Sequence, residues 1–156
     1  MYWTVWLALG LFAIGELGKR AQSPRRAEPR WAWRCSALGV LLMLTHIMLA
    51  MALRHGWSHA AAMAATARQT QAVFGLDWGG GVYVNYLFVV AWTAELVVWR
   101  LAPARHASRG PALTWLLRAF YLIVIANAGI VFAVGWRRMA GAAIVALLLM
   151  AWRPRS

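Results

Sequence analysis

The chain has 156 residues, of which 63% are hydrophobic and only four are acidic, and its formal net charge is +12. A soluble domain of this length needs far more charged surface, so the composition excludes an ordinary soluble protein and indicates an integral membrane protein. The basic residues form short clusters between long apolar runs, which argues against a nucleic-acid-binding surface and is typical of inner-membrane proteins.

Five apolar segments predict an all-α, polytopic membrane helix bundle that forms one transmembrane domain over residues 1–156. The expected spans are 3–18, 36–53, 82–101, 113–134 and 139–152. At 1.5 Å per residue the first and last segments cover about 24 and 21 Å, less than the hydrocarbon core of roughly 30 Å. The last segment is therefore expected either to span or to be re-entrant. The basic segments 19–34 and 103–111 are expected to be loops.

The segment 54–81 is too polar to span and is expected to lie outside the membrane. Ser58 is a plausible N-cap for an alanine-rich helix that Gly75 ends. We expect this short helix to lie at the membrane interface. The triple glycine Gly79–Gly81 lacks the residues of a phosphate-binding loop, so its expected role is a tight turn into the third span.

The distribution of basic residues predicts the orientation. With five spans and the N-terminus outside, eleven basic residues are cytoplasmic, four are external and Arg118 lies within a span. The cytoplasmic residues are Lys19, Arg20, Arg25, Arg26, Arg30, Arg34, Arg100, Arg105, Arg109, Arg153 and Arg155. Four spans would move the last two outside and weaken this bias. The predicted location is a bacterial-type inner membrane with a cytoplasmic C-terminus.

A polar stripe marks one face of the third span and is expected to face the bundle interior. The stripe consists of Asn85, Phe88, Trp92, Glu95 and Trp99. Glu95 and Arg118 lie at similar depth, which allows an ion pair that Glu16 could share. We expect a structural pair rather than a proton or ion relay, because the outer half has few titratable groups.

The histidines raise the alternative of a metal or haem site. His46 lies in the middle of the second span without a second imidazole at matching depth, so a neutral histidine bonded to a neighbouring helix is favoured over a haem ligand. His55 and His59 are four residues apart, with Asp77 in the same external segment. The expected helix start at Ser58 separates these histidines and weakens a shared metal site.

The favoured function is a non-catalytic accessory or anchoring subunit of a larger membrane complex. No cofactor is expected, and the expected partners are the lipid bilayer and either another protein or a second copy of the chain. Small residues in the last two spans permit close helix packing, within the chain or against a partner. One alternative is a metal- or haem-binding redox protein with an external histidine site. Another is an ion-translocating or transporter subunit that uses Glu95 and Arg118.

Overall fold

The computed structural model describes residues 2–20 and 30–153, and within these ranges the chain is helical without strands. The elements are α1 (Tyr2–Arg20), α2 (Arg30–Arg54), α3 (His59–Phe74), α4 (Gly81–Leu101), α5 (Pro103–Ala107), α6 (Pro111–Ala126), the π-helix η1 (Asn127–Val131) and α7 (Trp136–Trp152). The expectation of an all-α fold is confirmed.

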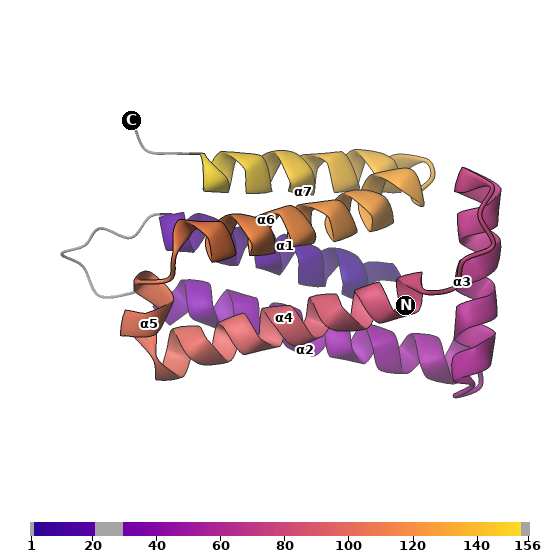
Figure 1. Cartoon of the computed structure of the whole chain (residues 1–156), viewed down its shortest axis with the longest axis horizontal. Coiled ribbons are helices and arrows are strands. Elements are labelled where there is room, and N and C mark those ends of the chain that lie inside the picture. Colours follow the sequence, from indigo (N-terminus) through magenta and orange to yellow (C-terminus); the bar gives the residue numbers. More distant parts are fainter. Residues whose placement is uncertain (1, 21–29, 154–156) are drawn as a thin grey trace.

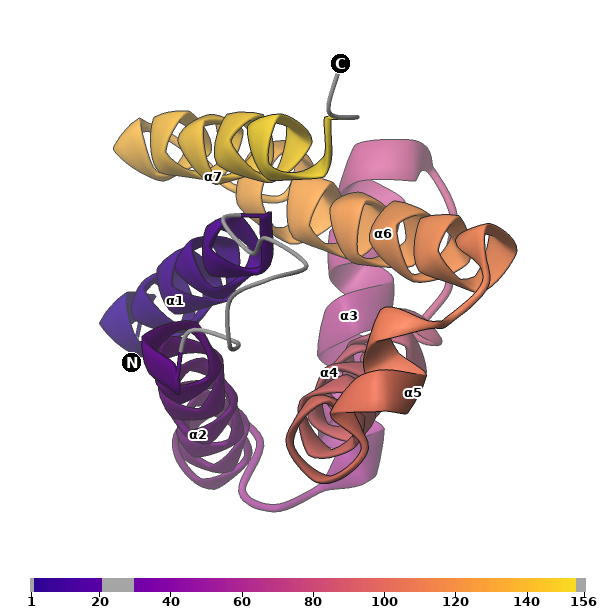
Figure 2. The ribbon, with the colours of Figure 1, turned by 90° about the vertical axis from the view of Figure 1, so that its left-hand side faces the viewer.

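The long helices α1, α2, α4, α6 and α7 run along the long axis of the molecule, and α3 lies across one end of them (Figure 1). Their directions alternate along the chain. The end of the bundle that carries α5 is therefore opposite to the end that α3 covers. Seen along the bundle, α1 lies between α2 and α7, and α4 lies beside α5 and α6 (Figure 2).

Three helical segments are long and apolar enough to cross a membrane: Arg30–Arg54, Gly81–Leu101 and Pro111–Val131. Length and composition alone therefore support three spans and not five. The other two long helices, α1 and α7, are less apolar or shorter than these three segments. The last turns of α1 contain Glu16 and Lys19. Helix α7 has only 17 residues and carries Arg137 and Arg138 in its first turn.

Two expected loops are partly helical. The segment 19–34 was expected to be a loop, but α1 continues to Arg20 and α2 already begins at Arg30, where Ala32 is fully buried. The rest of this loop, with Arg25 and Arg26, lies outside the described residues, as does Arg155 near the C-terminus. In the segment 103–111, Pro103 opens α5, because a proline is pre-organised for the first helical position.

The fourth expected span ends earlier than residue 134, because α6 passes into the π-helix η1 and helical structure stops at Val131. Two small residues pack closely at η1. A Cβ built on Gly141 would lie 2.0 Å from the carbonyl oxygen of Gly129, so the two backbones touch. The close packing expected of small residues in the last two spans therefore occurs within the chain, between η1 and α7.

The short helix expected between the second and third apolar segments is present as α3. The Ser58 side chain accepts a hydrogen bond from the Ala61 amide at 3.1 Å, and Gly75 ends the helix with a φ of 71°. Ala62 and Thr70 are buried. The helix therefore packs one face onto the end of the bundle and exposes the other.

Candidate functional site

A buried carboxylate, Glu95 of α4, gathers charged and polar side chains at the α5 end of the bundle. Its Oε1 accepts hydrogen bonds from Arg109 Nη1 at 2.7 Å and Lys19 Nζ at 3.0 Å, and its Oε2 accepts one from the Tyr121 hydroxyl at 3.0 Å. His106 Nε2 lies 3.5 Å from Oε1. Hydrogen bonds to charged groups are stronger than neutral ones, so this carboxylate holds several elements together.

A second carboxylate, Glu16 of α1, joins the same network through Lys19. Lys19 Nζ lies 2.5 Å from Glu16 Oε1, and Trp152 Nε1 donates to Glu16 Oε2 at 2.8 Å. Lys19 thus bridges the carboxylates of α1 and α4, while the indole fixes the end of α7. With Arg109, the two cations balance the two carboxylates, and their attraction offsets part of the cost of burying the charges.

Arg118 does not pair with Glu95 among the described residues. Its guanidinium lies 5.4 Å from the ring centroid of Trp115 and 5.7 Å from that of Trp152, a cation–π arrangement. The Arg118 Nε is buried without a hydrogen-bond partner. The sequence argument located the charged region but named a different cation, since Lys19 and Arg109 hold Glu95.

Aromatic side chains fill the middle of the bundle. Phe12 lies 4.9 Å from Trp92 and 5.2 Å from Tyr121, measured between ring centroids, and Phe88 lies 5.5 Å from Tyr121. Each of these four rings is at most 3% exposed. We call these four residues the aromatic layer. Along α4 this layer lies between Asn85 and Glu95, so it separates the charged network from the end that α3 covers.

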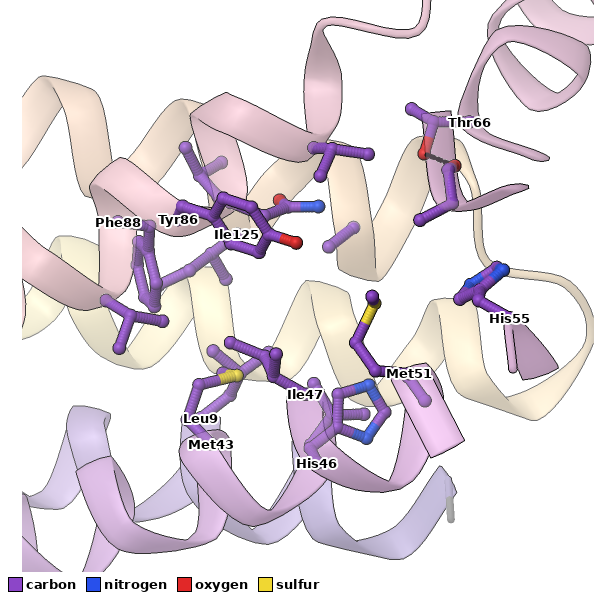
Figure 3. A pocket seen from close by; sticks show the side chains of 18 residues that line it. Leu9, Met43, His46, Ile47, Met51, His55, Thr66, Tyr86, Phe88 and Ile125 are labelled. Atoms are coloured by element: carbon purple, nitrogen blue, oxygen red, sulfur yellow. Dashed lines mark hydrogen bonds between the residues drawn. The ribbon is translucent and has the colours of Figure 1, made fainter. Parts of the chain in front are cut away.

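Beyond the aromatic layer lies a cavity of about 250 Å³ under α3. Its walls come from α1, α2, α3, α4, α6 and η1. Most lining residues are apolar, and the polar ones are His46, His55, Thr66, Asn85 and Tyr86. In Figure 3, Tyr86 and Phe88 lie on one side of the space and Met43, His46, Ile47 and Met51 on the other. We call this space the outer cavity.

The structure brings His46, His55 and Asn85 to this cavity. His46 Nδ1 lies 3.1 Å from Thr4 Oγ1 of α1, so this imidazole bonds to a neighbouring helix, as expected. His59 contacts the hydroxyl of Tyr83 at 3.2 Å and that of Tyr86 at 3.5 Å.

Asp77 lies in the connection between α3 and α4, away from the cavity lining. Within residues 2–20 and 30–153, no three His, Cys, Asp or Glu side chains come together in a way that could hold a metal ion.

The polar stripe expected on the third span is largely confirmed. Phe88, Trp92, Glu95 and Trp99 are buried. Asn85 departs from this expectation, because it is exposed where it borders the outer cavity. Sequence reasoning missed Tyr121 and Trp152 as partners of the carboxylates. For Lys19 a signal was available, because a residue three positions after Glu16 lies on the same face of a helix and can pair with it.

Comparison with known proteins adds no relative: no family model, no curated protein and no solved structure matches this chain.

Proposed function

We propose that the protein is a five-span membrane protein without chemistry of its own, which acts as an accessory or anchoring subunit of a larger membrane assembly. The observation that carries this proposal is the internal pairing of the charged network. Lys19 and Arg109 balance Glu16 and Glu95, and Tyr121 and Trp152 occupy the remaining carboxylate oxygens. All four carboxylate oxygens therefore have partners within the chain, which stabilises helix register and leaves no carboxylate oxygen open for a substrate.

The same pairing supports membrane insertion of α1. Glu16 is only 6% exposed, and Lys19 turns toward it, so the charges face the bundle. The surface of α1 carries apolar side chains such as Leu7 and Ile14, which are 55% and 42% exposed. Charged side chains in membranes are tolerated where they face the interior and pair.

In the proposed topology α3 lies on the external side and α5 on the cytoplasmic side of a bacterial-type inner membrane. The basic residues support this orientation because Arg100, Arg105, Arg109 and Arg153 all lie at the α5 end. Because α1, α2, α4, α6 and α7 alternate in direction, this proposed topology has the N-terminus outside and the C-terminus inside.

The aromatic layer favours a non-conducting role over ion translocation. A proton or ion that reached Glu95 from the cytoplasmic side would meet the closely packed rings of Phe12, Phe88 and Trp92 before the outer cavity. A translocation path needs continuous polar groups or water. The alternative of a transporter subunit therefore has less support than a structural role.

The outer surface of α2 is the proposed contact with a partner. Leu38, Leu41 and Met48 are 50%, 60% and 54% exposed and lie at helical spacing on one side. Such an apolar ridge can pack against a helix of another membrane protein as well as against lipid.

Gentle extraction of the tagged full chain from its native membrane, followed by native mass spectrometry, tests this proposal. We expect a stable complex with another membrane protein, lost in Leu41→Trp and kept in the matched Leu116→Trp variant on α6, where Leu116 is 66% exposed. A chain that is always monomeric would contradict the proposed subunit role. A complex that survives both substitutions equally would contradict the proposed contact through α2.

A further inference from the structure

The outer cavity has the composition of a site for a neutral molecule. None of the Asp, Glu, Lys or Arg residues that the structure describes lines it. The side nearest the aromatic layer is apolar, with Leu9, Met43 and Phe88, whereas Thr66 and His55 lie toward α3 (Figure 3). An occupant that matches these walls is apolar at one end and forms hydrogen bonds at the other.

The volume of the cavity restricts the size of the occupant. A cavity of roughly 150 Å³ accepts a benzene molecule, and pockets for small molecules begin at roughly 300 Å³. At about 250 Å³, the outer cavity matches a single substituted ring. A longer tail on that ring would have to lie outside, among the membrane lipids.

The side chains around the space favour a flat ring. The rings of Tyr86 and His46 lie on opposite sides of the cavity, and Met43 and Met51 add polarisable sulfur atoms (Figure 3). The side chains of Asn85, which is exposed, and His55, which is half-buried, line the cavity, and neither side chain makes a hydrogen bond to another described residue. Amide and imidazole N–H groups can donate to ring oxygens.

We infer that the outer cavity binds a neutral, lipid-soluble ring that carries carbonyl or hydroxyl oxygens, the chemistry of a quinone head group. The ring lies between α2 and α4, with its oxygens toward Asn85 and His55. This inference does not depend on the accessory-subunit role, because it concerns binding and not assembly.

Helix α3 covers this site. Ala62 and Thr66 of α3 line the cavity, and His59 at the start of α3 contacts Tyr83 and Tyr86 of α4. Tyr86 thus belongs both to the cavity wall and to the contact that holds α3 in place. A ligand that enters at the α3 end of the bundle would therefore have to displace α3.

Binding of decylubiquinone to the full chain in lipid nanodiscs tests the inference, with decanol as the control for the tail alone. We expect saturable binding of the quinone and none of decanol. Ala50→Phe fills the cavity from α2 and should weaken quinone binding at least about tenfold. Ala52→Phe, on the same helix but exposed and outside the lining, should bind like the unsubstituted chain.

Two further measurements keep the test independent of any one variant. Asn85→Leu preserves side-chain size and should weaken binding by about tenfold through the loss of one hydrogen bond. An arylazido quinone should label α2 and α4 of the unsubstituted chain. The inference would be overturned if the quinone did not bind saturably or if decanol bound equally well. It would also be overturned by equal affinity of Ala50→Phe and Ala52→Phe for the quinone, or by labelling remote from α2 and α4.

Discussion

Lys19, near the end of α1, lies 3.0 Å from the Oε1 of Glu95, which is 76 residues further along the chain. The same amine also contacts Glu16, so one cation joins two helices through two carboxylates. Buried charges stabilise a fold only when they are paired and hydrogen-bonded. This relationship explains how a chain of high hydrophobicity retains charges within its bundle.

Removal of the charge on Glu95 should destabilise the bundle. Glu95→Gln leaves Arg109 and Lys19 without their shared carboxylate, and the loss of one member of a buried pair costs about 3 kcal/mol or more. Thermal unfolding in detergent measures the effect. Asp77→Asn is the control, because Asp77 is exposed, and its unfolding temperature should match that of the unsubstituted chain.

Double-mutant cycles should separate the two arginines near Glu95. Arg109 donates to the carboxylate at 2.7 Å, whereas Arg118 lies against the rings of Trp115 and Trp152. We expect a coupling energy of about 1 kcal/mol or more for Arg109→Met with Glu95→Gln, and a smaller one for Arg118→Met. A larger coupling for Arg118 would mean that the pair suggested by the sequence forms after all.

The contact between Gly129 and Gly141 should not tolerate a methyl group. Gly141→Ala places a Cβ against the Gly129 carbonyl and should cost about 2 kcal/mol as η1 and α7 separate. The control is Gly10→Ala, because a Cβ at Gly10 meets no atom within 4 Å. Alanine favours the helix there, so thermal unfolding should occur at the same or a higher temperature.

The N-cap of α3 should control local opening over the outer cavity. Ser58→Ala removes the acceptor for the Ala61 amide and should cost about 1 kcal/mol. Hydrogen exchange at the α3 amides should therefore accelerate by about fivefold, without faster exchange in α4. Ser108→Ala, at the exposed end of α5, serves as the control and should leave α3 exchange unchanged. Uniform acceleration across the bundle would contradict a separate opening of α3.

The sequence predicted those features that depend on local signals. Ser58 and Gly75 delimit α3 because capping depends on neighbouring residues. The 3.6-residue period placed Trp92 and Glu95 on a buried face.

Features that depend on packing between distant segments were not predicted. No sequence pattern shows that Arg109, beyond α5, turns back to Glu95, or that Trp152 reaches Glu16. The outer cavity likewise depends on where α3 rests, which the spacing of His55 and His59 does not reveal.

Cysteine labelling tests most directly whether all five long helices cross the membrane. In a Cys35→Ala background, single cysteines replace Trp3, Ser58, Ser108 or Arg153, each of which is exposed. A membrane-impermeant maleimide is then applied from the external side of intact cells. The account predicts labelling at positions 3 and 58, with positions 108 and 153 labelled only after permeabilisation. If position 153 were labelled in intact cells together with position 58, α7 would not cross the membrane. If position 3 were protected in intact cells together with position 108, α1 would not cross it.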